Sequence, residues 1–296
     1  MQSFSNAVTE LADGVSPSVV NVNAGRRGGT GLVWSEDGLV VTASHVLGHS
    51  QTPTVTLQDG REMQAKIMGT DPYADVALLK IDASGLTPIA LGSAEGVKVG
   101  QFVLALANAF GRRVSATSGM ITSLRRNMRG FWGIMIEDAV VSDAKLNPGY
   151  SGGPLVDASG KLLGMNVAYF ASRGVAVSVD SLKETVGRIS RDGGVKKGFL
   201  GVVVEPIELP EEVAKSADVG QDEGLLVRSV ETGSPAKAAG VAVGDIILKL
   251  GDSRATDEYE LHKALSQDVV GKQLGLMVLR TEKVTALRVT PAEAEQ

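Results

Sequence analysis

Short runs of β-branched and aliphatic residues recur through the first two thirds of the chain, and turns rich in glycine, aspartate and serine separate them. Many short strands at close spacing are typical of antiparallel barrels and sandwiches. The pattern therefore predicts a mostly β first domain. Its predicted strands include residues 19–22, 39–42, 54–57, 76–81, 102–106, 162–167 and 174–179.

One segment at the end of this block has the spacing of a helix instead. Leu182, Val186 and Ile189 fall on one face of such a helix, and Asp180 is expected to be its N-cap. The glycines that follow Asp192 predict the end of the helix and a short linker. A domain boundary is therefore expected here.

Strands continue after the linker and are joined by two helices. Strands are expected at residues 200–205, 224–230, 245–250, 273–279 and 285–290. A short helix should follow Ser234, because Pro235 suits a first helical turn, and a longer helix should run from Asp257 to Gln267. These patterns divide the chain into a first domain (1–192), a linker (193–198), a second domain (199–291) and a tail (292–296).

The composition narrows the classes of function. The 296 residues suit two domains, and a net charge of -5 offers no basic surface for nucleic acid. The absence of cysteine excludes disulfides and thiolate chemistry. No apolar run approaches the roughly 20 residues that a membrane span needs. Residues 1–6 lack the pattern of a signal peptide, so the chain is expected to be cytoplasmic or to begin at a mature or engineered start.

The strongest chemical signal is the run Asn147-Pro148-Gly149-Tyr150-Ser151-Gly152-Gly153-Pro154-Leu155. A serine hydroxyl becomes a nucleophile when a base accepts its proton and nearby donors stabilise the oxyanion. Gly149 allows a tight turn, so that its N–H and that of Ser151 can form an oxyanion hole. Gly152 and Gly153 are expected to keep side chains away from the substrate. The alternative for such a motif on its own is a glycine-rich surface turn.

The base is expected upstream of Ser151. The serine elbow of α/β hydrolases requires a helix directly after the serine and a later histidine; Gly152-Gly153-Pro154 would break that helix, and only His262 follows. His45 ends an apolar strand, which can hold an imidazole rigidly. Residue 46 is valine, so the zinc motif His-Glu-x-x-His is absent, and no metal or cofactor is expected.

An acid is expected to orient the imidazole. Asp75 lies at the entry to the strand predicted at 76–81, whereas Asp71 is better explained as a strand-edge or turn residue. His45, Asp75 and Ser151 follow the chain order of chymotrypsin. We therefore predict these three residues as a catalytic triad.

Together these motifs resemble the HtrA/Deg (high-temperature-requirement) serine proteases over nearly the whole chain. The resemblance lies in residues 28–33, 42–46, 75–80, 142–149, 151–155 and 174–177. It implies a mostly β fold. A chymotrypsin-like protease domain of two six-stranded β-barrels would come first, with the triad between the barrels, and an α+β PDZ domain would follow. It also implies a serine endopeptidase that degrades unfolded or misfolded proteins without ATP. A homotrimer or higher oligomer is expected, with Phe4 as a candidate contact. The expected location is the cell envelope or periplasm if the chain is a mature or truncated form.

The resemblance extends to two binding regions. Phe199, Leu200, Gly201 and Val202 match the loop with which the family's PDZ domain binds a C-terminal carboxylate, and the peptide would add a strand beside that loop. The residues expected to line the peptide groove or, equally well, the core are Leu261 and Leu265. The residues expected to line a small apolar S1 pocket are Leu146 and Ala168.

A departure from the family at Tyr150 leaves a second function open. Tyr150 stands where the family usually has Asn, and a bulky ring beside the nucleophile can change the oxyanion loop. The alternative to an active protease is thus a proteolytically weak chaperone or peptide-binding scaffold, although the presence of His45, Asp75 and Ser151 favours the protease.

Lys145 bears on substrate preference instead. It either reaches S1 and favours an acidic P1 residue or, as is common for lysine, is solvated.

Overall fold

The structure is a computed structural model. It describes residues 2–25, 28–48, 50–72, 74–109, 113–129, 135–170, 173–193, 198–209, 221–265, 269–281 and 283–293. The chain divides into two units, Met1–Gly194 and Val195–Gln296.

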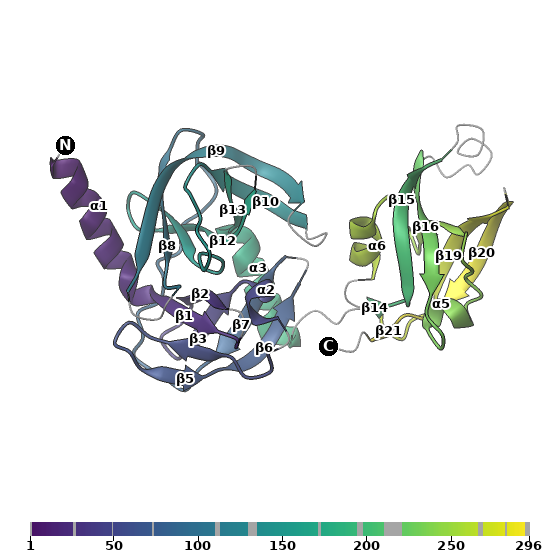
Figure 1. Cartoon of the computed structure of the whole chain (residues 1–296), viewed down its shortest axis with the longest axis horizontal. Coiled ribbons are helices and arrows are strands. Elements are labelled where there is room, and N and C mark those ends of the chain that lie inside the picture. The colour runs from purple at the N-terminus through teal and green to yellow at the C-terminus, as the bar shows by residue number, and fades with distance from the viewer. Residues whose placement is uncertain are drawn as a thin grey trace. The chain divides into compact units, whose positions relative to one another are not determined.

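Seven strands of the first unit form one sheet in the order β5-β4-β1-β2-β3-β7-β6 (Figure 1). They are β1 (Val19–Asn23), β2 (Gly28–Val33), β3 (Leu39–Thr42), β4 (Thr54–Thr56), β5 (Glu62–Gln64), β6 (Lys66–Asp71) and β7 (Val76–Lys80). The two edge strands, β5 and β6, are separated in the chain by Ala65 alone. They therefore act as one bent strand that pairs with β4 and then with β7, and this brings the edges of the sheet together as a barrel.

The other six strands of this unit form a closed barrel in the order β10-β13-β12-β11-β8-β9. They are β8 (Phe102–Ala107), β9 (Ser115–Arg129), β10 (Met135–Ser142), β11 (Pro154–Asp157), β12 (Leu162–Phe170) and β13 (Arg173–Ser178). Alternate residues of β8 lie in different hydrophobic clusters, because successive side chains of a strand point to opposite faces. Val103 and Ala105 belong to a cluster of second-barrel residues, whereas Leu104 and Leu106 join the cluster shared with the first barrel. Burial on both faces explains the continuous apolar run of this strand.

The helices of the first unit differ in part from the sequence prediction. Helix α1 (Gln2–Val15) was not predicted; its residues Leu11 and Val15 pack on the core of the first unit. A one-turn helix, α2 (Ser44–Leu47), follows β3, so His45 lies on a helix rather than at a strand end. Within the described ranges, no helix has the length and apolar character needed to span a membrane.

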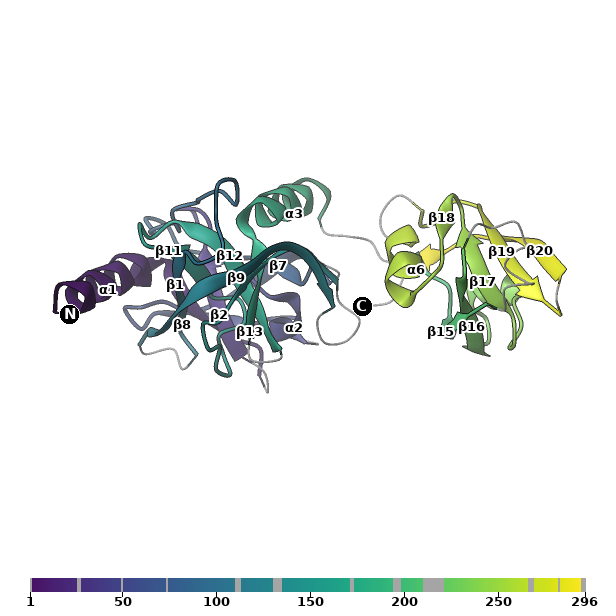
Figure 2. The same cartoon turned by 90° about the horizontal axis from the view of Figure 1, so that it is seen from above.

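Helix α3 (Val179–Asp192) packs against β6, β7 and β12 (Figure 2). Its N-cap is Ser178, whose hydroxyl accepts the N–H of Ser181, and not Asp180 as predicted. The carboxylate of Asp180 instead accepts the N–H of Ala94 at 3.0 Å, so it bonds to a different segment of the chain. The helix ends at Gly193, which is left-handed (φ 75°) as a C-terminal glycine allows.

The second unit is built on a sheet in the order β15-β16-β17-β19-β20, and β18 pairs with β17. Its elements are β14 (Gly198–Phe199), β15 (Val202–Glu208), β16 (Glu223–Val230), α5 (Pro235–Ala238), β17 (Ile246–Leu250), β18 (Ser253–Arg254), α6 (Glu258–Ala264), β19 (Leu274–Arg280), β20 (Lys283–Val289) and β21 (Ala292–Glu293). Strands β14 and β21 pair with each other. Residue 198 of the expected linker and residues 292 and 293 of the expected tail are thus strand residues.

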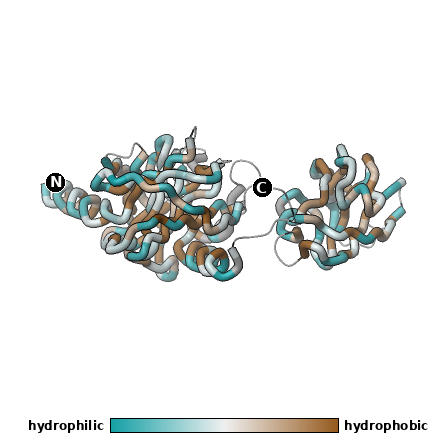
Figure 3. Tube along the Cα trace, turned by 90° about the horizontal axis from the view of Figure 1, so that it is seen from below, coloured by the Kyte–Doolittle hydropathy of each residue, from teal (hydrophilic) through white to brown (hydrophobic). Residues whose placement is uncertain are grey.

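Each unit has its own hydrophobic interior, and Figure 3 shows hydrophobic residues along the strands of both. In the second unit an ion pair joins a buried carboxylate to an exposed guanidinium: Arg280 Nε and Nη2 donate to the two carboxylate oxygens of Asp245 at 2.7 and 2.8 Å. Burial alone would raise the pKa of Asp245, but the hydrogen bonds from Arg280 and from the N–H of Ala242 outweigh it and hold the pKa below its usual range. The carboxylate therefore stays charged at neutral pH and ties β17 to β19.

Candidate active site

The predicted base and acid are in direct contact. His45 Nδ1 lies 2.6 Å from Asp75 Oδ2, and the backbone N–H of His45 donates to Asp75 Oδ1 at 2.9 Å. The carboxylate of Asp75 is buried, with 4% of its side chain exposed, whereas 34% of the His45 side chain is exposed. A carboxylate at Nδ1 makes that nitrogen the protonated one, so Nε2 has the lone pair that can accept a proton.

A turn between β6 and β7 holds Asp75 in place. Asp75 has a φ of 54°, a left-handed conformation that is uncommon for residues other than glycine. Within this turn, Asp71 Oδ1 accepts the N–H of Ala74 at 3.1 Å, and Arg188 of α3 donates to Asp71 Oδ2. The N–H of Ser44 donates to the Asp75 carbonyl at 3.2 Å. Asp71 is thus the last residue of β6, the strand-edge form of the role expected for it, and its side chain bonds support the unusual backbone of Asp75.

Ser151 lies on the loop between β10 and β11, and this loop is bonded to the first barrel. The N–H of Thr30 on β2 donates to the Ser151 carbonyl at 2.9 Å. A Cβ on Gly29 would lie 2.8 Å from the Ser151 carbonyl oxygen and 2.8 Å from Val46 Cγ2. Ser151 and the residue that follows His45 therefore flank the same glycine, and a side chain at residue 29 would push them apart.

The backbone of the Ser151 loop leaves two donors unused. Among the described residues, the N–H groups of Gly149 and Ser151 make no hydrogen bond, whereas that of Tyr150 donates to Asn147 and that of Gly152 to Asn166. Gly149 has a φ of 90°, and a Cβ on it would lie 2.3 Å from the Cβ of Ala109. Only glycine fits here, and the two free donors are those predicted for an oxyanion hole.

The reason for the two following glycines differs from the one expected. A Cβ at Gly152 would lie 1.9 Å from the Thr30 carbonyl oxygen, and one at Gly153 would lie 2.2 Å from the Leu106 carbonyl oxygen. Close backbone packing against both barrels therefore requires these glycines, independently of any substrate.

Thr30 is a site residue to which the sequence reasoning gave no role. Its hydroxyl donates to the Gly149 carbonyl at 2.7 Å and accepts the N–H of Asn108 at 2.9 Å. The hydroxyl of Thr42 donates to the Thr30 carbonyl at 2.7 Å. The only available signal was the motif Gly28-Gly29-Thr30-Gly31, since Thr30 and Gly149 lie 119 residues apart.

The residues predicted for S1 lie on neighbouring segments. A Cβ on Gly174 would lie 3.2 Å from Leu146 Cγ, and Leu146 itself is buried. Ala168 pairs with Val175 across β12 and β13; its side chain lies outside the described residues. Lys145 is exposed, and its carbonyl accepts the hydroxyl of Thr117 at 2.9 Å.

The residues predicted to bind peptide gather at one edge of the second unit. Leu261 and Leu265 share a buried cluster with Leu200, and the half-buried Val202 packs against it. Gly201 has a φ of 75°, and a Cβ on it would lie 2.2 Å from Ser234 Cβ and 3.1 Å from the ring of Phe199. Within the part of the chain that the structure describes, the N–H groups of Leu200 and Gly201 donate no hydrogen bond, and β15 is the last strand of its sheet.

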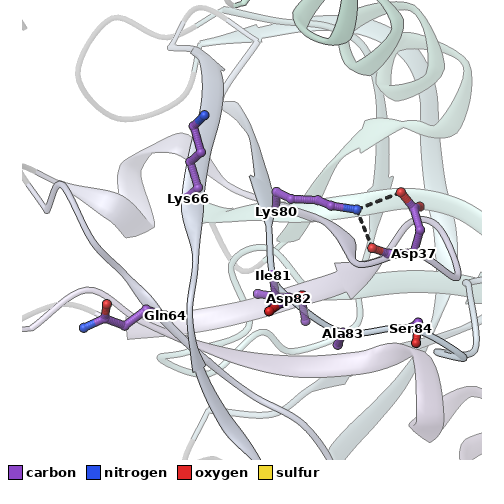
Figure 4. Close-up of a pocket in the computed structure, with 8 residues that line it drawn as sticks. All are labelled: Asp37, Gln64, Lys66, Lys80, Ile81, Asp82, Ala83 and Ser84. Atoms are coloured by element: carbon purple, nitrogen blue, oxygen red, sulfur yellow. Dashed lines mark hydrogen bonds and ion pairs between the residues drawn. The ribbon is translucent and has the colours of Figure 1, made fainter.

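A separate hollow of about 590 Å³ lies on the first barrel (Figure 4). Its lining residues are Asp37, Gln64, Lys66, Lys80, Ile81, Asp82, Ala83 and Ser84. Charges of both signs line it, and Lys80 Nζ donates to Asp37 Oδ2 at 2.7 Å. It contains none of the predicted site residues, and we assign it no role.

Two family descriptions match the chain. Residues 29–165 match the trypsin-like peptidase domain, and residues 198–290 match the PDZ domain. Paired β-barrels with an Asp75–His45 pair, followed by a PDZ domain, define the class of trypsin-like serine peptidases that carry a PDZ module. The chain belongs to the HtrA/Deg family of this class.

Individual relatives agree with this assignment. The chain is 34% identical over 272 residues to a "Probable periplasmic serine endoprotease DegP-like" of Brucella suis biovar 1 (strain 1330), covering 89% of this chain and 52% of that protein. A protein of the same description from Chlamydia trachomatis serovar D is 35% identical, with 88% and 53% covered. The chain thus spans about half the length of these relatives.

Solved structures match over nearly the full chain. The structure described as "HtrA-type protease AlgW with tripeptide" is 31% identical in sequence to this chain. The alignment covers 97% of each of the two chains, with a TM-score of 0.71. The structure of the serine endoprotease from Yersinia pestis is 28% identical in sequence to this chain. The alignment covers 97% of this chain and 98% of that one, also with a TM-score of 0.71. These matches confirm the fold class and the family predicted from the sequence.

Proposed function

We propose that the chain is a serine endopeptidase that cleaves unfolded or misfolded proteins through an acyl-enzyme. The observation that carries this proposal is the 2.6 Å contact between His45 Nδ1 and the buried carboxylate of Asp75, in the unit that also contains the Ser151 loop. In the first half-reaction, Ser151 Oγ attacks the peptide carbonyl while His45 Nε2 accepts the hydroxyl proton. Asp75 stabilises the imidazolium, and His45 then returns the proton to the leaving amine.

The second half-reaction uses the same residues. His45 removes a proton from water, the resulting hydroxide attacks the acyl-serine, and the proton returns to Ser151 Oγ as the acid product leaves. In both halves the N–H groups of Gly149 and Ser151 stabilise the oxyanion. Leu146 and Ala168 are proposed to line an S1 pocket for a small apolar side chain, since Lys145 is exposed.

The second unit is proposed to bind C-terminal peptides. A peptide would add a strand to the free edge of β15, and its carboxylate would accept the free N–H groups of the loop formed by Phe199, Leu200 and Gly201. Val202 is proposed to contact the last side chain of the peptide, with Leu261 and Leu265, which are buried in the cluster on which Val202 packs, beneath it. Relatives in the same family have been solved with a tripeptide and with a decapeptide, which supports this proposal.

Cleavage of casein tests both parts of the proposal. We expect the protein to cleave casein, and a peptide with an apolar C-terminal residue to accelerate cleavage, whereas the same peptide with an amidated end should not. Gly201→Ala should abolish the acceleration, because a Cβ would lie 2.2 Å from Ser234 at a positive φ. Gly233→Ala is the matched control, since Gly233 also has a positive φ (80°) but no atom within 4 Å of the added group. Suppression of aggregation without any cleavage would favour the chaperone or scaffold alternative.

A homotrimer or higher oligomer is also proposed, with the N-terminal segment at the contact. Phe4 of α1 is 62% exposed, and its ring lies edge-on to Phe102 at 5.8 Å. Met120, the cross-strand partner of Phe102, and Val99 are also exposed. Exposed apolar patches of this kind mark interfaces between proteins. We expect Phe4→Ala to shift the sedimentation coefficient toward that of a monomer, whereas the exposed Glu10→Ala on the same helix should not; a wild type that sediments as a monomer would contradict the proposal.

The cell envelope or periplasm is the proposed compartment. The relatives are named periplasmic, which supports it. Detection of the protein in cytoplasmic fractions alone would contradict it.

A further inference from the structure

Tyr150, the residue directly before Ser151, has its side chain inside the second barrel. It is only 3% exposed and lies in a buried cluster with Ala107, Leu146 and Leu155. Its ring therefore packs in the interior of the barrel, next to the loop whose oxyanion donors the sequence suggested it could alter. A ring buried in this way anchors the adjacent backbone, because withdrawing it would expose its apolar surface and leave a cavity.

The phenol at the end of this ring meets Thr117 of β9. The hydroxyl of Thr117 donates to the Lys145 carbonyl at 2.9 Å. Burial raises the pKa of Tyr150, and the nearby Thr117 hydroxyl offsets only part of this effect, so the phenol is neutral near neutral pH. The Thr117 hydroxyl of β9 thus lies near the Tyr150 phenol and holds the carbonyl of Lys145, at the start of the segment that leads to the nucleophile.

The backbone of Tyr150 is fixed as well. Its N–H donates to the Asn147 carbonyl at 3.1 Å, and its own carbonyl accepts the N–H of Gly153 at 2.9 Å. On the other side of the loop, the Thr30 hydroxyl of the first barrel donates to the Gly149 carbonyl. The peptide group after Tyr150 contains the unused N–H of Ser151, and the one before it contains the Gly149 carbonyl that Thr30 holds. The unused N–H of Gly149 belongs to the next peptide group back, so a rotation of the backbone around Gly149 and Tyr150 changes the direction of both donors.

We propose that Tyr150 and Thr117 are positioning residues that keep the N–H groups of Gly149 and Ser151 directed at the oxyanion of the reaction. This inference rests on the proposed function, because it assigns the two residues to the same reaction. Neither residue touches the reacting atoms; both act through the backbone of the loop. A loop held from both barrels needs no rearrangement when substrate binds, and such preorganised donors are a large part of the catalysis of acyl transfer.

The test measures kcat and KM for a chromogenic peptide substrate. It also measures the inhibition constant of a peptide aldehyde against the same reaction. The aldehyde forms a hemiacetal with the serine, which requires the same oxyanion donors. The variants are Tyr150→Phe, which keeps the ring, and Thr117→Val, which keeps the shape of the side chain. Thr122→Val is the control, because Thr122 lies on the same strand and its hydroxyl also donates to a backbone carbonyl, that of Val141 at 3.3 Å.

We expect both variants to lose roughly tenfold in kcat with KM unchanged, less than the roughly 100-fold loss when a donor is removed outright. The aldehyde should bind more weakly by the same factor, the melting temperature should stay within a few degrees, and the control should match the wild type. Unchanged kcat in both variants would overturn the inference while leaving the proposed function intact. A loss that merely follows the melting temperature would show a structural role only and would also overturn it. A wild type that neither cleaves the substrate nor binds the aldehyde would refute the proposed function, and the inference with it.

Discussion

Replacing Ser151 with alanine is expected to lower the rate of peptide hydrolysis by roughly 10⁵- to 10⁶-fold, as the loss of the nucleophile does in serine proteases of other folds. The fold should not suffer, because the only hydrogen bond of the Ser151 hydroxyl among the described residues is a long one of 3.4 Å to the Val167 carbonyl. Initial rates of casein and peptide cleavage measure the loss. Labelling by a fluorophosphonate, which reacts with activated serines, should disappear in parallel.

Ser118→Ala is the matched control for this experiment. Ser118 is an exposed residue of β9 on the same barrel, and its loss should leave the rate within twofold of the wild type, as is usual for surface substitutions. Retention of more than about a hundredth of the activity by Ser151→Ala would show that another residue is the nucleophile.

The second large effect is expected for Asp75→Asn, which should lose roughly 10⁴-fold in kcat near neutral pH. Asp75 accepts two hydrogen bonds from His45, one from the backbone N–H and one at Nδ1. An amide has only one oxygen, so one of these bonds must meet an NH₂ group. The imidazole then takes the tautomer with the proton on Nε2, or turns away, and in both cases it no longer accepts the proton of Ser151.

Asp82→Asn is the control for this variant, because Asp82 is an exposed residue of the same barrel. Circular dichroism should be that of the wild type for both, since asparagine has nearly the shape of aspartate. A rate for Asp75→Asn within tenfold of the wild type would show that His45 does not depend on this carboxylate and would remove Asp75 from the mechanism.

The fold class and the family could be predicted because their signals are local in the chain. Short runs of β-branched and aliphatic residues between turns predicted most of the strands, and the motifs around His45, Asp75 and Ser151 carried the resemblance. The contact between His45 and Asp75 agrees with the predicted acid–base pair, while the catalytic roles remain predictions until they are measured.

The features that were not predicted depend on contacts between distant segments. Thr30 supports a loop 119 residues away, and no local pattern reports such a bond. The choice of Ser178 over Asp180 as N-cap depends on Ala94, which offers Asp180 an alternative partner. The direction of the Tyr150 ring was equally undetermined, because a phenol suits a wet cleft as well as a barrel interior that contains a hydroxyl partner.

The bonds from β2 to the Ser151 loop also bear on how this unit unfolds. The donors are on one barrel and the loop belongs to the other, so opening either barrel removes the hydrogen bonds of Thr30 to Gly149 and Ser151. We therefore expect the two barrels to open together, because a state with one barrel open loses the support of the Ser151 loop. If the proposed activity is correct, a half-folded species of this unit should be inactive and unable to cleave its neighbours.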